Sequence, residues 1–170
     1  MPLILPREYD FLSQIAPVSD LGQRFRSQSS SIHVTGVFAT MPIWIYHIVG
    51  YYDGDLYPNH NSLPPYEHGS KTYYWELSNG KVIDGKNDLQ FINHSCNPNL
   101  ESREVLINDQ LHIQFYALRN IMPGEELTLN YRLRKDKGDK HQYKCFCSSP
   151  NCRGTMLDPN HKRSGKKKTL

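Results

Sequence analysis

Apolar residues occur in short runs separated by turn-forming residues, and no more than one or two short helices are predicted. Residues 32–57 are rich in β-branched and aromatic side chains and contain the turn 53–55. This pattern predicts two or three short strands. The polar run 27–31 before them is typical of a loop or linker, and residues 9–15 predict one short helix.

Two hairpins are predicted further along the chain, each with a polar turn between two apolar runs. Their arms are residues 73–77 with 81–83 and residues 104–107 with 111–118. Apolar and polar side chains alternate along 111–118 and again along 127–131, as in strands with one buried face. Residues 58–70 are rich in Pro, Asn and Gly and predict an irregular loop. The chain is therefore expected to be mostly β, built from many short strands.

Charge is distributed unevenly along the 170 residues. The formal net charge is +3. Residues 1–131 hold 8 basic and 14 acidic side chains, whereas residues 132–170 hold 12 basic and 3 acidic ones. An acidic body argues against a protein that binds nucleic acid over its whole surface, and it attracts a basic substrate.

Several classes of protein are disfavoured by what the chain lacks. The mean hydropathy is −0.64, and no segment approaches a membrane span. The first six residues have a three-residue apolar run between prolines and no basic region, so a secretory signal is not expected and the protein is expected to be intracellular. Phosphate-binding, Rossmann, nucleophile-elbow and zinc-protease motifs are missing.

The four cysteines have a spacing that favours a metal site. Three of them fall within eight residues, and the fourth lies about fifty residues earlier: Cys96, Cys145, Cys147 and Cys152. Disulfides are rare in a reducing compartment, and four thiolates are the ligand set of one tetrahedral structural zinc ion. Surface thiols together with one buried cysteine are the alternative.

Three further features have a local explanation and a functional one. Residues 93–99 (NHSCNPN) form either an Asx-rich turn or a binding segment, and local pattern favours the turn. Glu125 and Glu126 point to opposite faces if they lie on a strand, so a solvated turn is preferred to a shared acid–base site. Tyr131 is either a core aromatic residue or a hydroxyl delivered to a site, and Gly36 alone indicates no more than a bulge.

Taken in order, these segments resemble the SET domain of protein lysine methyltransferases with a post-SET zinc-binding tail. The resemblance covers about residues 32–155, and the segments that carry it are TGVFA (35–39), YDGD (52–55), YYW (73–75), FINHSCNPN (91–99), GEELTLNY (124–131) and the C-x-C-x4-C cluster. Their joint occurrence overturns the local preference for a simple turn at residues 93–99.

The resemblance implies a fold of small, curved sheets in which residues 93–99 and 124–131 form a C-terminal pseudoknot. It also implies that S-adenosylmethionine is the cofactor and that a target lysine enters from the opposite face. By similarity, Tyr131 is the catalytic hydroxyl. The cofactor would be held by Val34, Thr35, Gly36, Val37, Phe38, Tyr73, Asn93 and His94, with Phe146 beside the adenine. The lysine channel would be lined by Tyr52, Trp75 and Leu129.

By the same similarity, Cys96, Cys145, Cys147 and Cys152 would ligate one Zn²⁺. Four protein ligands leave no open position for water, so this ion would be structural. The sequence also departs from the family pattern. Val34 replaces the first glycine of a G-x-G, Gln90 replaces an arginine, and Asn130 and Leu129 stand where the family has Asp and an aromatic residue.

The expected organisation is an N-terminal flank (1–31), a SET domain (32–134), a post-SET zinc segment (141–157) and a basic tail (158–170). The expected activity is methyl transfer to a lysine ε-amine of a basic protein, most commonly a histone tail in this family, which points to the nucleus in a eukaryote. A non-catalytic SET-like module that binds basic peptides or nucleic acid is the alternative. The basic tail leaves a weak nucleic-acid contact open. No membrane association is expected, and the oligomeric state is undetermined.

Overall fold

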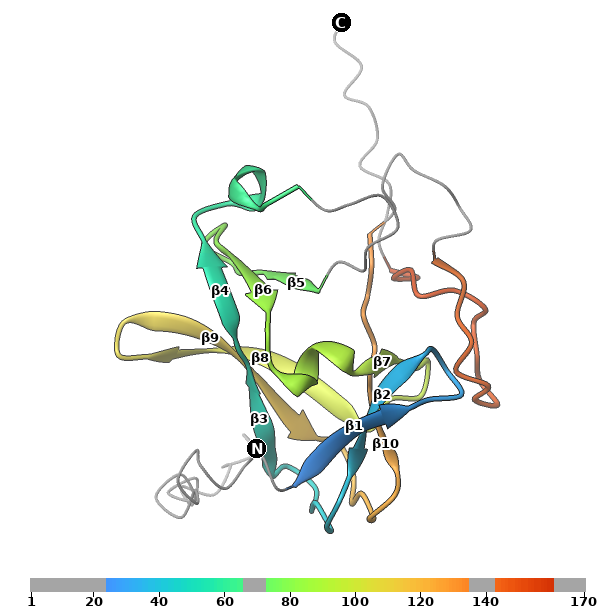
Figure 1. Ribbon diagram of the computed structural model, residues 1–170. Helices are drawn as coiled ribbons and strands as arrows, with labels where there is room; N and C mark the ends of the chain where they lie inside the picture. Colours follow the sequence, from blue (N-terminus) through green and yellow to red (C-terminus); the bar gives the residue numbers. More distant parts are fainter. Residues whose placement is uncertain (1–23, 66–72, 135–142, 161–170) are drawn as a thin grey trace, which may run out of the picture.

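The computed structural model describes residues 24–65, 73–134 and 143–160, and it is mostly β (Figure 1). The predicted helix at residues 9–15 and most of the basic tail lie outside these residues. None of the helices within the described ranges is long and apolar enough to cross a membrane. The elements are β1 (Phe25–Ser29), β2 (Thr35–Ala39), β3 (Ile48–Tyr52), β4 (Gly54–Tyr57), η3 (His60–Ser62), β5 (Tyr74–Glu76), β6 (Val82–Gly85), η4 (Asp88–Phe91), β7 (Asn93–His94), β8 (Leu100–Ile107), β9 (Gln110–Ala117) and β10 (Glu126–Leu129).

These strands form three small sheets. Their strand orders are β1-β2-β10-β7, β3-β9-β8 and β4-β6-β5. Figure 1 shows β3 leading directly into β4, so one continuous stretch of chain links the second sheet to the third. The predicted strands between residues 32 and 57 and both predicted hairpins are confirmed.

The long β8–β9 hairpin turns at Asn108 and Asp109, both of which have positive φ angles, 49° and 59°. Two consecutive positive φ angles are typical of the two-residue hairpin turn that Asn and Asp favour. On β9 the predicted buried face is confirmed, because Ile113, Phe115 and Ala117 are at most 1% exposed.

The core lies where the three sheets meet. Val37 on β2, Val49 on β3 and Ile83 on β6, one from each sheet, are buried in the same hydrophobic cluster. The largest side chains that are almost completely buried are Phe115, Ile43, Leu100, Ile113, Ile121, Leu127, Val37, Val49 and Val82.

One sequence prediction is wrong in part. Residues 27–29 were expected in a loop, but they belong to β1, which pairs antiparallel with β2 from Phe25↔Ala39 to Ser29↔Thr35. A serine-rich edge strand carries no apolar alternation, and it is held by backbone hydrogen bonds to an apolar neighbour. The first sheet therefore includes residues before the boundary expected at residue 32.

Candidate active site and metal centre

Two segments about thirty residues apart in sequence are paired in parallel at the edge of the first sheet. β7 pairs with β10 through Thr128↔Asn93 and Leu129↔His94. The Ser95 N–H donates to the Leu129 carbonyl at 2.8 Å. We call residues 93–99 together with residues 126–131 the knot region; this pairing agrees with the pseudoknot that the resemblance predicts.

The Asn99 side chain makes hydrogen bonds to the backbone inside the knot region. Its amide donates to the Glu126 carbonyl at 2.8 Å, and its side-chain oxygen accepts from the Thr128 N–H at 2.8 Å. Asn99 is only 2% exposed. A polar side chain so deeply buried must have its hydrogen bonds made within the protein, and here both ends of the amide are used. The polar sequence of residues 93–99 thus joins two segments rather than forming an isolated turn.

The Asn93 side chain connects the knot region to the first two strands. Its amide group donates to the Thr35 carbonyl at 2.9 Å and to Glu126 Oε1 at 2.8 Å, with the Ser30 hydroxyl at 3.2 Å. One amide group has only two protons, so these acceptors share them. Asn93 therefore fixes the loop between β1 and β2 against β10.

Glu126 is a site residue that sequence reasoning missed. The Ser30 hydroxyl lies 2.8 and 2.9 Å from its two carboxylate oxygens. Within the described ranges Glu126 makes no ion pair. A Cβ atom on Gly36 would collide with this carboxylate, so the lack of a side chain at Gly36 makes room for it.

The adjacent Glu125 behaves as the sequence predicts. It accepts from the Met122 N–H at 2.7 Å and pairs with Arg119 at 2.7 Å in an exposed turn. The hydrogen bond from Arg119 lowers the pKa of Glu125. Both residues are partly buried, but their carboxylates have different partners: Glu125 bonds within its own turn, and Glu126 bonds to Ser30 and Asn93.

Replacing Glu126 with glutamine is expected to destabilise the fold by about 1–3 kcal/mol, because the amide has one acceptor oxygen where the carboxylate has two, so the Ser30 or the Asn93 donor loses a partner. Chemical denaturation measures this change. Glu125→Gln is the matched control and should cost less than about 1 kcal/mol, as exposed pairs do. Equal losses in the two variants would contradict the role given to Glu126.

The loop between β1 and β2 contains a strained residue. Val34 has φ +32° and is 65% exposed, and the Ser30 N–H donates to its carbonyl at 3.1 Å. A β-branched residue at positive φ is an outlier, since this region favours glycine. Val34 occupies the position where the family pattern has glycine. The backbone there has the positive φ that glycine favours, although the residue is valine.

Val34→Gly is expected to stabilise the protein by about 0.5–1 kcal/mol. Removing the strain of the positive φ raises the free energy of unfolding by about 1–2 kcal/mol, and the extra conformational freedom of glycine in the unfolded chain lowers it by about 0.5–1 kcal/mol. Urea denaturation tests this. Val34→Ala keeps a Cβ and should gain less; a destabilised glycine variant would show that the backbone here is not strained.

The remaining residues predicted for the cofactor loop lie in two environments. Val37 and Phe38 pair with β1 on one side and with β10 on the other, so their backbone groups are used within the sheet. Thr35 lies at the loop end of β2, where its carbonyl meets Asn93. A ligand can therefore approach the backbone near residues 33–35 more readily than near 37–38.

His94 and Tyr131 are in direct contact. The Tyr131 N–H donates to His94 Nδ1 at 3.1 Å, and the two rings lie 5.3 Å apart. Burial, with a smaller effect from the charge of Arg153, lowers the pKa of His94 to about 4. His94 is therefore neutral near pH 7, as its role of acceptor toward Tyr131 requires.

The Tyr131 hydroxyl has a defined proton position. It donates to the Ile92 carbonyl at 2.5 Å. Burial raises the pKa of Tyr131, and the nearby Tyr73 and Glu126 raise it further. The phenol stays protonated at any working pH, and its oxygen lone pairs remain free of that hydrogen bond.

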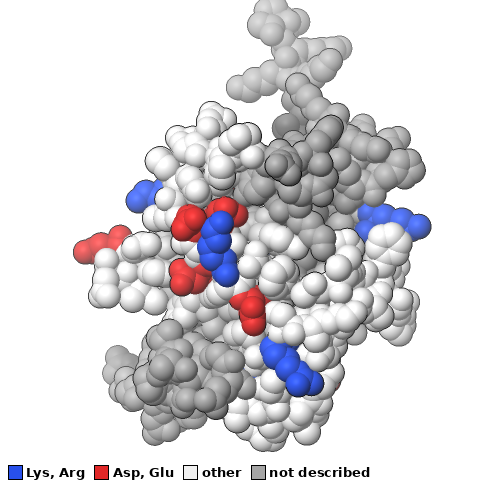
Figure 2. All heavy atoms as spheres, viewed as in Figure 1, with Lys and Arg blue, Asp and Glu red and all other residues white. Residues whose placement is uncertain are grey.

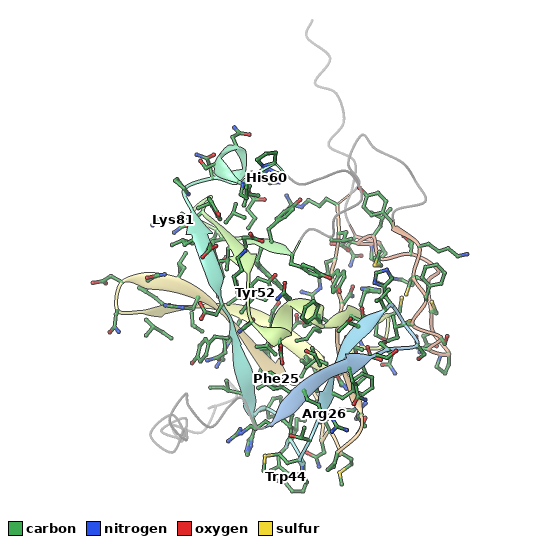
Figure 3. All side chains as sticks on the ribbon, viewed as in Figure 1. Phe25, Arg26, Trp44, Tyr52, His60 and Lys81 are labelled. Carbon is green, nitrogen blue, oxygen red and sulfur yellow. The ribbon has the colours of Figure 1, made fainter. Side chains whose placement is uncertain are left out.

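The predicted channel residues form an aromatic cluster with one residue that was not predicted. Tyr52 and Trp75 lie 5.8 Å apart, and both pack against Phe115 at 6.1 and 5.7 Å. The Tyr52 hydroxyl donates to the Tyr73 carbonyl at 2.6 Å. Figure 3 shows Tyr52 near the centre of the molecule, well away from Trp44 at the lower edge. Leu129, 3% exposed, is part of the same core.

Tyr73 and Phe146, the two remaining residues predicted to contact the cofactor, have fewer described contacts with the knot region. The Tyr73 ring packs edge-on against Phe91 at 5.4 Å, and burial raises the pKa of Tyr73. Phe146 is 51% exposed, and Lys144 Nζ lies 5.0 Å from its ring centre. Tyr73 packs against Phe91, two residues before the knot region, whereas Phe146 lies between Cys145 and Cys147 in the segment of the cysteines.

The four cysteines converge beside the knot region. Their sulfur atoms all lie within 4.8 Å of one another, and Cys96 Sγ is 3.8 Å from Cys145 Sγ. Zn–S bonds of about 2.3 Å in a tetrahedron require S···S separations of about 3.8 Å. Residues 143–160 carry three of them, and this segment contacts Cys96 just after β7 (Figure 1).

Backbone N–H groups surround these sulfurs as they do thiolates that bind a metal. The N–H groups of Cys96, Cys147, Arg153 and Gly154 each point to a cysteine sulfur at 3.3–3.4 Å. Burial tends to raise the pKa of Cys147, but hydrogen bonds from Cys96 and Ser149 outweigh it and lower that pKa to about 5. Burial raises the pKa of Cys145. The donor set and its geometry fit one structural zinc ion.

Charge near the aromatic cluster is mixed. Lys86 pairs with Asp84 at 3.3 Å and with Asp55 at 3.7 Å. Figure 2 shows acidic side chains gathered around a basic one on this face, over the region of β4 and β6. The third sheet, which carries Trp75 of the aromatic cluster, therefore also carries these carboxylates.

Comparison with known proteins identifies the family. The SET domain family model matches residues 34–132. The chain is 33% identical to histone-lysine N-methyltransferase ATX2 of Arabidopsis thaliana over 150 residues, 80% of this chain and 13% of that protein. It is 39% identical to histone-lysine N-methyltransferase SETD2 of Mus musculus over 91 residues, 52% of this chain and 4% of that protein.

A solved structure has the same fold. It is ctPRC2 in an autoinhibited conformation bound to S-adenosylmethionine, with a TM-score of 0.57 and 26% identity over 64% of this chain and 15% of that one. The chain thus spans less than a fifth of each of these relatives. The resemblance found in the sequence is confirmed: the chain belongs to the SET domain family.

Proposed function

We propose that this chain is an S-adenosylmethionine-dependent protein-lysine N-methyltransferase domain that acts on histone lysine. The single observation that carries the proposal is the position of Tyr131. Its hydroxyl proton is committed to the Ile92 carbonyl, and the residue is held by His94 at the end of the knot region. The relatives are named as histone-lysine methyltransferases, and the structural neighbour is bound to the same cofactor.

The residues that would hold the cofactor are those around the loop between β1 and β2, with Asn93, His94 and Tyr73. When bound, S-adenosylmethionine supplies a methyl group activated by a positive sulfonium. Asn93 keeps the loop in place through Thr35, and the Glu126 carboxylate contributes negative charge beside it. A partly buried carboxylate that makes no ion pair among the described residues favours a positively charged ligand over a neutral one.

Tyr131 would orient the two reacting groups. Because the Tyr131 O–H donates its hydrogen bond to the Ile92 carbonyl, the phenol oxygen can only accept hydrogen bonds from other groups. Lone pairs attract a methyl group that carries partial positive charge and hold an incoming amine in line with it. Because the pKa of Tyr131 is raised, the residue positions groups and does not act as a base.

The aromatic cluster would receive the lysine side chain. An ordinary lysine amine has a pKa of about 10.4, and transfer into an apolar site lowers that value. Tyr52, Trp75 and Phe115 supply such surroundings, and aromatic faces stabilise the methylammonium product. Alignment of two bound reactants then provides much of the rate.

Leu129 bears on how many methyl groups are added. It is 3% exposed and has no hydroxyl with which to hold a water molecule against a methylated amine. We therefore expect di- or trimethyl-lysine among the products. Mass spectrometry of a peptide after exhaustive reaction measures this, and a product that stops at monomethyl-lysine would contradict it.

A histone substrate fits the acidic body of the chain, and a histone methyltransferase would work in the nucleus. The test is transfer of labelled methyl groups from S-adenosylmethionine to a panel of core histones, with calorimetric titration of the cofactor alongside. Label on a histone lysine supports the proposal. Cofactor binding without transfer to any histone would overturn the histone assignment, and no cofactor binding would favour the non-catalytic alternative.

A further inference from the structure

Both ring nitrogens of His94 are engaged, and they face different parts of the site. Nδ1 accepts the Tyr131 N–H at 3.1 Å, and Nε2 lies 3.5 Å from Cys96 Sγ. The imidazole is 3% exposed, so water does not compete for either nitrogen. The ring therefore stands between a cysteine of the metal cluster and the backbone of the expected catalytic tyrosine.

The proton position on this ring follows from its partners. A backbone N–H can only donate, so Nδ1 must be the acceptor and carries no proton. A neutral imidazole then has its proton on Nε2, which points that N–H at the Cys96 sulfur. A metal-bound cysteine is a thiolate, and a thiolate accepts such a hydrogen bond more strongly than a thiol does.

We propose that His94 is a positioning residue that couples the metal centre to Tyr131, an inference that rests on the proposed function only for the role of Tyr131. With the metal bound, the Cys96 thiolate orients Nε2–H, and the ring so fixed holds the Tyr131 backbone through Nδ1. Without the metal, the ring loses one of its two anchors, and Tyr131 is held less firmly for transfer.

Other contacts also connect the cysteine segment to the knot region, so the test must separate them from His94. The Arg153 guanidinium donates to Asn130 Oδ1 at 3.2 Å, beside Tyr131 in sequence. The Leu133 N–H donates to the Met156 carbonyl at 3.1 Å. These contacts do not pass through the imidazole, so they persist in variants of His94 alone.

Two substitutions of His94 each remove one of its two hydrogen bonds and keep the other. His94→Asn places an amide oxygen near the position of Nδ1, so it keeps the acceptor for Tyr131 and loses the donor to Cys96. His94→Gln places an amide nitrogen near the position of Nε2, so it keeps the donor to Cys96 and loses the acceptor. Each variant is thus the matched control for the other.

Zinc affinity is measured by competition with a chelator, and the state of Tyr131 by its backbone amide resonance in selectively labelled protein. The asparagine variant should bind zinc about 10–100-fold more weakly, as loss of an outer hydrogen bond to a ligand does. Its Tyr131 amide resonance should no longer respond to removal of zinc, whereas that of the wild-type protein should shift when zinc is removed. The glutamine variant should bind zinc within about threefold of wild type and show a shifted Tyr131 amide resonance. Its kcat should fall by a larger factor than its KM changes.

Unchanged zinc affinity in the asparagine variant, or an unchanged Tyr131 amide in the glutamine variant, would overturn the coupling. If either variant fails to fold, nitrogen NMR of the zinc-loaded wild-type imidazole decides instead. A proton on Nε2 is expected, and a proton on Nδ1 would refute the arrangement. Absence of methyl transfer by the wild-type chain would defeat the proposed function while leaving these binding and resonance measurements decisive for the coupling.

Discussion

Tyr131→Phe is expected to reduce methyl transfer by at least about 100-fold while the affinity for S-adenosylmethionine changes by less than about threefold. Removal of one positioned group that acts mainly in the transition state typically costs about 10²–10³ in kcat. The hydroxyl oxygen is the part of Tyr131 placed to interact with the reacting groups. The ring contact with His94 is retained in phenylalanine.

The loss of the hydrogen bond from Tyr131 to Ile92 must be separated from the loss of function. Tyr131→Phe leaves the Ile92 carbonyl without its donor, at a cost of about 1 kcal/mol. Tyr51→Phe is the control, since the Tyr51 hydroxyl accepts from Gln114 at 2.7 Å on a different sheet. Comparable stability losses with transfer lost only in Tyr131→Phe are expected; undiminished turnover in that variant would refute its role.

Cys147→Ser is expected to weaken zinc binding by more than about 100-fold and to destabilise the zinc-loaded protein accordingly. A hundredfold weaker site in excess zinc corresponds to about 2.7 kcal/mol of lost stability. Cys147 is the cysteine with the lowered pKa, and its sulfur lies near the backbone of Cys96 in the knot region. Its loss therefore separates the cysteine segment from the site as well as removing a ligand.

Elemental analysis and thermal melting with and without a chelator measure this effect. The exposed Asn151, next to Cys152 but with no role as a ligand, offers the control Asn151→Ala, which should retain one zinc ion per chain. A Cys147→Ser protein that melts at the wild-type temperature, or a wild-type protein without zinc, would contradict a structural metal site.

The strands that the sequence predicts well are those with an apolar pattern and a clear turn. The β8–β9 hairpin is an example, because Asn108 and Asp109 suit its turn. β1 could not be predicted, since its serines carry no pattern and its stability comes from the neighbouring strand. Gln114 lies on the face predicted to be polar, yet it is 3% exposed because Arg103 and Tyr51 bond to its amide.

For the site, motif order indicated which segments would meet but not how their side chains would bond. The four cysteines converge as their spacing predicts. The hydrogen bonds and packing of Glu126 depend on Gly36, Ser30 and Asn93, which are distant from it in sequence, so no local pattern could show them. The bridging position of His94 likewise depends on two contacts made only in the folded chain.

The most direct test of methyl transfer is tandem mass spectrometry of a histone tail peptide incubated with the zinc-loaded chain and S-adenosylmethionine. We predict one or more methyl groups on a lysine ε-amine with the wild-type chain and none with Tyr131→Phe. An unmodified peptide with wild-type protein that binds both zinc and cofactor, or equal methylation by the two proteins, would contradict this.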